Sequence, residues 1–452
     1  MPYLRDTAAA LHSGELSSVD LLESAITAAK ASDSVFISIN EGLLSFAEAI
    51  DRGRRAGQTT PPLAGIPIAL KDLFNVRNET TLAGSLVRKH YAKPEANDAV
   101  VVAPLREAGL LFLGRTNLSE FAFSGMGLNP HYGTPLCIWD RQNQRIPGGS
   151  SSGSAVSVAE GIVGATLGSD TAGSCRIPAA FNGIVGVKPS FGRLSLQGIY
   201  PLSPTSDAPG PMARDLDSCF ILDQLMSAAT RPADPLPELQ ARDPASLRLI
   251  VPEARVMEDL DDEVKAAFNW SLEQLRDAGA VIVSQAMPVL DQCIDLFNTR
   301  AIALYEAYQH HQEMLENHLD EYDPFVSLRL LGGRDISESE QQSRYRDKRD
   351  LATGFNQQFD ELSGDAIVYP SAACIPPLVS SAADLEKAKQ INLRCLRNTS
   401  TANYFDGCSI SLPCHEIGKA PVGFMLSAKN GDDDALYRVA AAVEACLNPS
   451  TS

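Results

Sequence analysis

Short apolar segments alternate with helical segments along most of this chain, and this alternation limits its fold more than any other feature. The apolar segments have strand length and are bounded by turn residues; they span 66–70, 110–113, 163–167, 247–251, 281–284, 367–369, 410–412 and 422–426. Helical patterns span 17–29, 98–109, 155–160, 262–278 and 434–447. Strands that are apolar on both faces need helices on both faces. The sequence therefore predicts an α/β fold with a central mixed, mostly parallel β-sheet covered by helices on both faces.

The segment 290–354 differs from the rest of the chain. It is polar and charged, has a helical pattern without a strand signal, and carries His310, His311 and His318. One interpretation is a helical insert on the surface. The other, which we expect, is an insert that shapes the wall of a substrate pocket.

Composition excludes several classes of function. Lys and Arg total 38 against 56 Asp and Glu, so the net charge is −18, and an acidic protein repels nucleic acid. No apolar run reaches the ~20 residues of a membrane span. The 9 cysteines form no CxxC pair, and the 7 histidines form no HExxH motif. We expect a reduced, cytoplasmic protein with no metal or other cofactor.

Two loops of small residues stand out within the apolar pattern. They cover 147–154, Pro-Gly-Gly-Ser-Ser-Ser-Gly-Ser, and 168–178, which includes Asp-Thr-Ala-Gly-Ser. Small residues let the backbone approach a ligand closely, and free N–H groups near a helix start favour a developing negative charge. Flexible connectors have similar composition. These loops, however, lie tightly between apolar elements, where linkers are uncommon.

Other motifs explain these loops less well. Residues 149–153 match G-x-S-x-G with Ser151 as nucleophile, but that motif needs a preceding strand, and 140–145 is strongly polar. A P-loop fails because Ser154 occupies the lysine position. No GxGxxG sequence occurs, so dinucleotide binding has no support.

At these loops the chain resembles the amidase signature family. The shared motifs are Gly-Gly-Ser-Ser at 148–151, Asp-Thr-Ala-Gly-Ser at 170–174, Arg-Ile-Pro-Ala-Ala at 176–180 and Gly-Val-Lys-Pro at 186–189. Further matches lie at 64–72, 114–122, 409–413 and 421–423. Because the resemblance covers nearly the whole chain, it implies the amidase signature fold as a single domain, 1–452.

The resemblance also implies a catalytic triad. Ser174 occupies the position of the nucleophile, and Ser150 that of a bridging serine which follows a cis peptide bond in this family. Lys71 matches the lysine that starts the proton relay. The family's supporting residues, which brace the loops by hydrogen bonds, match Ser151, Asp170 and Arg176.

The residue types suit this chemistry. A serine hydroxyl attacks well only when a base removes its proton, and no histidine lies near either loop. Lys71 directly follows an apolar strand, where burial lowers a lysine pKa and favours the neutral base. An exposed lysine paired with Asp72 is the alternative. The expected oxyanion hole consists of the backbone N–H groups of Thr171, Ala172, Gly173 and Ser174.

Some residues depart from the common family pattern. Ala172 replaces a frequent glycine, as in the allophanate-hydrolase-like branch. Cys175 follows the nucleophile, and we expect it to be a buried packing residue rather than the catalytic group. Leu136–Trp139 replaces a common Arg-Asn-Pro motif, so Met126, Tyr132 and Trp139, together with Phe123, form either an apolar substrate pocket or ordinary core.

The sequence thus predicts an amidohydrolase that cleaves C–N bonds of small or aryl amides through a Ser174 acyl-enzyme, with carbamates or esters as further candidate substrates. One alternative is a urethanase or allophanate-type carbamate hydrolase. Another is a glutaminase-type amidotransferase subunit that works in a complex. For the first two we expect a monomer or homodimer whose partner is a small amide or carbamate, not nucleic acid or a membrane.

Overall fold

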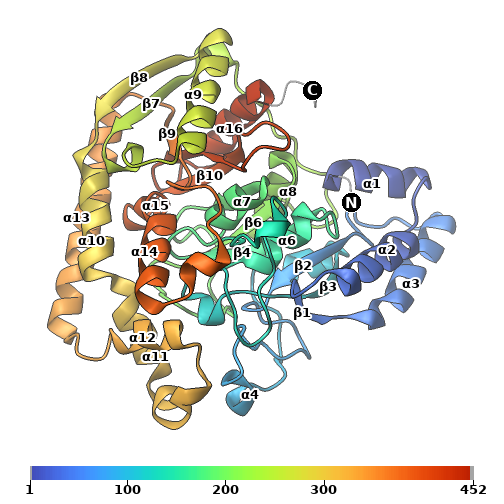
Figure 1. The fold of residues 1–452 in the computed structure, drawn as a ribbon. Helices are drawn as coiled ribbons and strands as arrows, with labels where there is room; N and C mark the ends of the chain where they lie inside the picture. Colours follow the sequence, from blue (N-terminus) through green and yellow to red (C-terminus); the bar gives the residue numbers. More distant parts are fainter. Residues whose placement is uncertain (1–2, 448–452) are drawn as a thin grey trace.

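The computed structural model describes residues 3–447, and one mixed sheet of eleven strands forms its centre (Figure 1). The strand order is β1-β3-β2-β4-β6-β5-β10-β11-β9-β7-β8. The strands are β1 Phe36–Ile39, β2 Pro67–Lys71, β3 Leu111–Thr116, β4 Ala165–Asp170, β5 Val185–Lys188, β6 Ala208–Ala213, β7 Arg248–Glu253, β8 Val281–Ala286, β9 Ala366–Pro370, β10 Cys408–Pro413 and β11 Gly423–Ala428.

Helices cover both faces of this sheet, as the apolar strands predict. Every residue of β2, β3, β4, β6, β9 and β11 is buried, which requires cover on both sides. The helices are α1 Leu4–Ser13, α2 Ser18–Ala31, α3 Leu44–Arg55, α4 Arg88–Tyr91, α5 Ala103–Glu107, α6 Ser152–Ala159, α7 Arg176–Asn182, α8 Leu216–Met226, α9 Asp262–Asp277, α10 Pro288–Arg300, α11 Ile302–His318, α12 Pro324–Leu331, α13 Glu338–Leu362, α14 Leu385–Leu396, α15 Ser400–Tyr404 and α16 Asp433–Leu447.

The α/β class and the mixed sheet are confirmed, but the expectation of a mostly parallel sheet is wrong. Among the described strands, six of the ten pairings are antiparallel. One cause is the short loop between β10 and β11, since parallel strands need a long crossover connection. Another is β6, a central strand with Pro209 and Pro211, which strand propensity does not identify.

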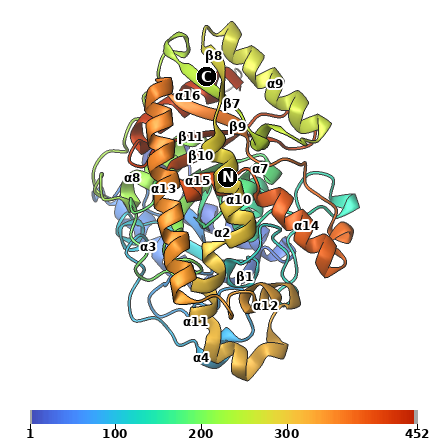
Figure 2. The ribbon, with the colours of Figure 1, turned by 90° about the vertical axis from the view of Figure 1, so that its left-hand side faces the viewer.

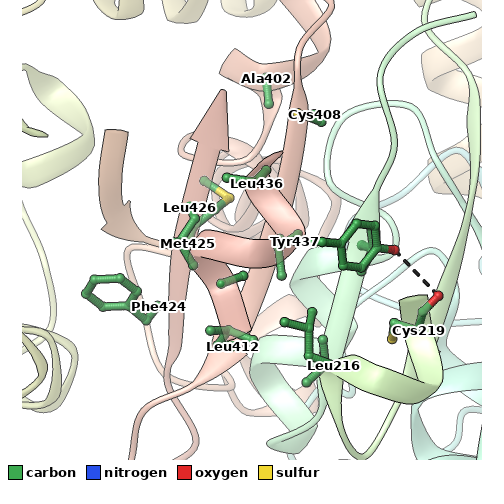
Figure 3. Close-up of a cluster of buried hydrophobic side chains, with 14 of the residues drawn as sticks. Leu216, Cys219, Ala402, Cys408, Leu412, Phe424, Met425, Leu426, Leu436 and Tyr437 are labelled. Atoms are coloured by element: carbon green, nitrogen blue, oxygen red, sulfur yellow. Dashed lines mark hydrogen bonds between the residues drawn. The ribbon is translucent and has the colours of Figure 1, made fainter. Parts of the chain in front are cut away.

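The core beside the sheet joins segments that are distant in sequence. In Figure 3, Leu412 of β10 and Leu426 of β11 face the cluster that includes Leu436 and Tyr437 of α16. The Tyr437 hydroxyl donates to the carbonyl of Cys219 in α8 at 3.5 Å. The C-terminal helix is thereby fixed against the middle of the chain.

The region from α10 to α13 is helical and forms one side of the molecule. Figure 2 shows α10 and the long α13 side by side, with α11 and α12 beyond their lower ends. Phe355 of α13 stacks on Phe405, with ring centroids 3.7 Å apart and an interplanar angle of 6°.

Among residues 3–447, no helix combines the length and hydropathy of a membrane span.

Candidate active site

Lys71 lies at the end of β2 and is fully buried. Its Nζ donates hydrogen bonds to Ser150 Oγ at 2.7 Å and to Ser169 Oγ at 2.8 Å. Burial lowers the pKa of Lys71 to about 7, although the nearby acidic groups Cys175 and Asp170 oppose this shift. The neutral amine is therefore well populated near neutral pH, as a general base requires.

Ser150 lies just before α6 in the first small-residue loop. The Gly149–Ser150 peptide bond is cis, and the Ser150 side chain is fully buried. Gly149 has no room for a side chain, because an added Cβ would lie 2.4 Å from the backbone nitrogen of Gly127. The crowded backbone thus places Ser150 Oγ against Lys71.

Ser174 lies in the second loop, between β4 and α7. It is 5% exposed and lines a pocket. The Ser151 amide donates to the Ser174 carbonyl at 3.3 Å, so the two loops are joined through the backbone. Within residues 3–447, no hydrogen bond links the hydroxyls of Ser150 and Ser174. The structure therefore brings the three residues together but forms only the Lys71–Ser150 contact of the expected relay.

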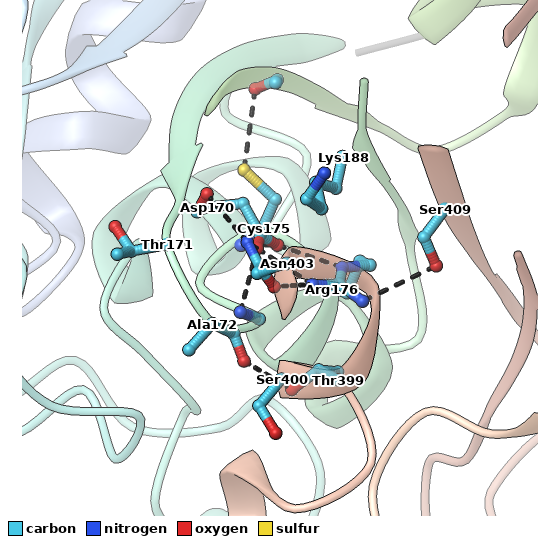
Figure 4. Close-up of polar contacts among 12 residues, drawn as sticks. Asp170, Thr171, Ala172, Cys175, Arg176, Lys188, Thr399, Ser400, Asn403 and Ser409 are labelled. Carbon is cyan, nitrogen blue, oxygen red and sulfur yellow. Dashed lines mark hydrogen bonds and ion pairs between the residues drawn. The ribbon is translucent and has the colours of Figure 1, made fainter. Parts of the chain in front are cut away.

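A buried ion pair braces the Ser174 loop (Figure 4). Asp170 accepts hydrogen bonds from Arg176 Nε at 3.0 Å and Nη2 at 2.9 Å, and from the amides of Gly173 at 2.8 Å and Cys175 at 3.1 Å. Burial favours the protonated carboxyl, but the positive charge and hydrogen bonds of Arg176 outweigh it and lower the pKa of Asp170 to about 2. Asn403 of α15 joins this network at 2.8 Å from Arg176.

The loop amides are not equally available to an oxyanion. The Gly173 N–H already donates to Asp170. Within the described residues, the amides of Thr171, Ala172 and Ser174 have no protein acceptor. The Ala172 carbonyl accepts a hydrogen bond from Thr399 Oγ1 at 2.8 Å, and Thr171 Oγ1 donates to Asp207 at 2.5 Å. These side-chain contacts hold the loop whose free N–H groups are those of Thr171, Ala172 and Ser174.

The pocket beside Ser174 is mainly apolar. Residues from the N-terminal half and from helices beyond residue 288 form it together. The apolar lining includes Phe123, Leu202, Phe297, Ala303, Leu396 and Tyr404. Arg329 and Ser206 add polar groups. An apolar lining with a few polar groups is typical of small-molecule sites.

The structure places the expected pocket residues elsewhere, apart from Phe123. Met126 lines a neighbouring cavity, which shares Ser124 with the Ser174 pocket. The Tyr132 ring lies under Lys89, and the Trp139 ring lies under Arg145. Neither ring belongs to the lining of the Ser174 pocket. Sequence distance from the serine loops did not indicate which aromatic residues face the site.

The supporting residues lie where the loops meet. Ser151 Oγ donates to the Ser169 carbonyl at 3.3 Å. The Cys175 thiol is buried and contacts the Gly210 carbonyl at 3.7 Å, and burial raises the pKa of this thiol. A high pKa leaves the thiol protonated and a poor nucleophile.

Several residues of this site have little or no local signal in the sequence. Ser169 contacts Lys71, and its only signal is that it is a polar residue on a fully buried strand. Asn403 and Thr399 contact the Ser174 loop from more than two hundred residues away in sequence. Arg329 lies in the polar insert, where no local pattern separates it from surface arginines.

A buried lysine beside two serine loops at one end of an α/β sheet is an arrangement suited to a hydrolase with a serine nucleophile. The amidase family profile matches residues 19–437. This chain belongs to the amidase family.

Its relatives span nearly its whole length. The 2-amino-5-chloromuconic acid deaminase of Comamonas testosteroni is 31% identical over 406 residues, which cover 89% of this chain and 86% of the relative. One component of the glutamyl-tRNA(Gln) amidotransferase of Symbiobacterium thermophilum is 30% identical, over 94% of this chain and 93% of that component. A solved amidase superposes with a TM-score of 0.86 at 31% identity, over 99% of this chain and 100% of that chain. The chain is accordingly an amide C–N hydrolase.

Proposed function

We propose that this protein hydrolyses small amides through an acyl-enzyme on Ser174, with Ser150 and Lys71 as its proton relay. The single observation that carries the proposal is the fully buried Lys71 Nζ at 2.7 Å from Ser150 Oγ, in a strand end that meets both serine loops. A buried amine with a pKa of about 7 serves as a base near neutral pH.

The proposed reaction begins with neutral Lys71. Ser150 donates its hydroxyl proton to Nζ across the 2.7 Å contact and takes the proton of Ser174. Ser174 Oγ bonds to the amide carbonyl carbon, and the negative charge on the carbonyl oxygen is held by the free amides of Thr171, Ala172 and Ser174. Such oxyanion donors each contribute about 3–4 kcal/mol.

The second half of the cycle returns the protons. Ser150 passes a proton to the departing nitrogen, the C–N bond breaks, and the amine leaves. Water then attacks the acyl ester and frees Ser174. The Ser150–Ser174 contact forms when the substrate is bound, as catalytic hydrogen bonds of free enzymes often tighten in the complex.

The pocket supports a small substrate and a role for the helical insert. Phe297 comes from α10, Ala303 from α11, and Ala301 from the junction between them. Arg329 comes from α12. We therefore propose that the insert shapes the acyl or leaving-group pocket within a single 1–452 domain. Carbamates and esters share the attacked carbonyl and stay candidate substrates.

A second candidate is one component of an amidotransferase complex. The observation that favours it is the 30% identity to a component of glutamyl-tRNA(Gln) amidotransferase over 94% of this chain. A protein of this kind would need partner proteins for its full reaction. Turnover by the purified chain alone separates the two functions, because the hydrolase needs no partner.

The test is a hydrolysis screen of amides, carbamates and esters, read by ammonia or amine release. We expect amide turnover by the parent and a loss of several orders of magnitude in Ser174→Ala and Lys71→Ala. Cys175→Ala is the matched control and retains turnover. Parent-like activity of Lys71→Ala would disprove the relay, and parent-like activity of Ser174→Ala would disprove the acyl-enzyme.

A further inference from the structure

Arg329 is the unusual residue of the Ser174 pocket. It lies on α12 and lines the pocket together with Ser174, Thr171 and Ala172. Its Nε is buried without a hydrogen-bond partner. Among residues 3–447, no carboxylate forms an ion pair with it. A cationic side chain thus faces the site of the proposed reaction with its donors unused.

The other arginines near the site are paired. Arg176 forms a bidentate pair with Asp170, and Arg115 pairs with Asp72 at 3.0 Å. Arg329 is only partly buried, but even partial removal of a guanidinium from water without a counter-charge is unfavourable. The missing partner of Arg329 is therefore explained if an anion arrives with the substrate.

Aromatic rings orient the Arg329 guanidinium. Its central carbon lies 4.4 Å from the Phe123 ring centroid and 5.9 Å from that of Phe325. Stacking satisfies the faces of the guanidinium and leaves its in-plane N–H groups free for hydrogen bonds. Burial lowers the pKa of Arg329 to about 10, so the side chain stays charged at neutral pH.

We propose that Arg329 binds the carboxylate of an anionic amide substrate whose scissile carbonyl lies at Ser174. The carboxylate accepts two parallel N–H bonds from the guanidinium, the geometry that this pair favours. The apolar walls formed by Phe297, Leu396 and Tyr404 then contact the short carbon chain between the two polar ends. The substrate class is small amides with one carboxylate, and this inference rests on the proposed function.

The test compares matched substrate pairs in which a methyl group replaces the carboxylate. Glutaric acid monoamide is paired with pentanamide, and N-acetyl-β-alanine with N-propylacetamide, so that the carboxylate lies in the acyl part of one pair and in the leaving amine of the other. For at least one pair we expect the parent kcat/KM to favour the anion by about 10–100-fold. Arg329→Met should abolish this preference, and Arg329→Lys should retain part of it.

Two controls separate this inference from the proposed function. Arg334→Met removes an exposed arginine that pairs with Asp335 and should keep the preference. Ser174→Ala should abolish turnover of both members of a pair. Equal turnover of anionic and neutral amides by the parent, lost in Ser174→Ala, would overturn the role of Arg329 and leave the proposed function intact.

Binding gives a readout that does not depend on turnover. Glutaric acid monoamide and N-acetyl-β-alanine are titrated by calorimetry into the Ser174→Ala variant and into the double variant with Arg329→Met. For the amide that the parent prefers, the Kd of the single variant should be about 10–100-fold lower than that of the double variant. If neither amide binds more weakly when Arg329 is replaced, the inference is wrong, even if no amide is turned over.

Discussion

At the scale of single residues, the site depends on how one amine is desolvated. Lys71 is fully buried, and its two hydrogen-bond partners are neutral hydroxyls, Ser150 and Ser169. A carboxylate in direct contact would favour the ammonium and raise the pKa. The exposed Lys71–Asp72 pair that the sequence left open does not form, because Asp72 instead accepts from Arg115.

The first prediction concerns pH. Lys71 takes up a proton as the pH falls through about 7, and the protonated amine cannot act as a base. We therefore expect kcat/KM for a neutral amide to rise tenfold per pH unit on the acidic side and to level above about pH 7. A stopped assay between pH 5 and 9 measures this profile; flat activity down to pH 5 would contradict the lysine base.

The second prediction concerns Ser169, a positioning residue. Its hydroxyl accepts a hydrogen bond from Lys71 and so favours the protonated amine. Ser169→Ala should lower kcat about tenfold with little change in KM, and should move the acidic limb of the profile to lower pH. Ser157→Ala, a buried serine that bonds to the Ser154 carbonyl, should change neither. An unchanged acidic limb of the pH profile in Ser169→Ala would contradict this role.

At the scale of elements, the strand-to-helix turn between β4 and α7 organises the nucleophile. The turn begins at Asp170 and ends at Arg176, so one ion pair closes the loop that carries Ser174. Both side chains are fully buried. The same Asp170 carboxylate holds the Gly173 amide, which leaves Thr171, Ala172 and Ser174 as the free donors.

The third prediction tests this turn. Asp170→Asn removes the charge that compensates Arg176, so the free energy of unfolding should fall by about 3–5 kcal/mol. Adding Arg176→Met should restore part of this stability but not the activity. The amides of Gly173 and Cys175 would still lack the Asp170 carboxylate that holds them in place. Urea unfolding and amide turnover of the single and double variants measure both effects. Equal stability of Asp170→Asn and the parent would rule out this brace.

At the scale of the whole molecule, the pocket depends on docking between the N-terminal half and the later helices. Phe123 comes from the first half, whereas Phe297, Arg329 and Tyr404 come from beyond residue 290. The long α13 packs on Phe405, next to the pocket residue Tyr404, through the stacked pair of Phe355 and Phe405. Loss of this contact should affect both stability and the pocket.

The fourth prediction follows from that contact. Phe355 is fully buried, so Phe355→Ala should lower the free energy of unfolding by about 3–5 kcal/mol through the lost contacts and the cavity. Arg349→Ala, an exposed change on the same helix, is the matched control and should stay within about 0.5 kcal/mol of the parent. Equal midpoints for the two variants in thermal unfolding would contradict a structural role for this pair.

Much of the fold was predictable because apolar strands carry a local signal. All eight expected strands overlap strands of the sheet, from β2 to β11. Three of the described strands were missed. Two lack that signal: β6 contains Pro209, Gly210 and Pro211, and β5 is short and contains Gly186. The third, β1, is a four-residue edge strand whose Phe-Ile-Ser-Ile sequence is apolar but too short to stand out. Strand direction was mispredicted because it depends on how the connections cross the sheet.

The sequence by itself determined the chemical inventory: a lysine after an apolar strand, two serine loops, and, through the family resemblance, Asp170 and Arg176 as residues that brace the loops. These are local features, set by residue type and short-range geometry. The tertiary structure alone decided that Ser169 contacts Lys71 and that the Gly173 amide donates to Asp170. It also decided that Arg329 lines the Ser174 pocket without a counter-charge. Those facts depend on burial and on contacts between distant segments, which exist only after the chain has packed.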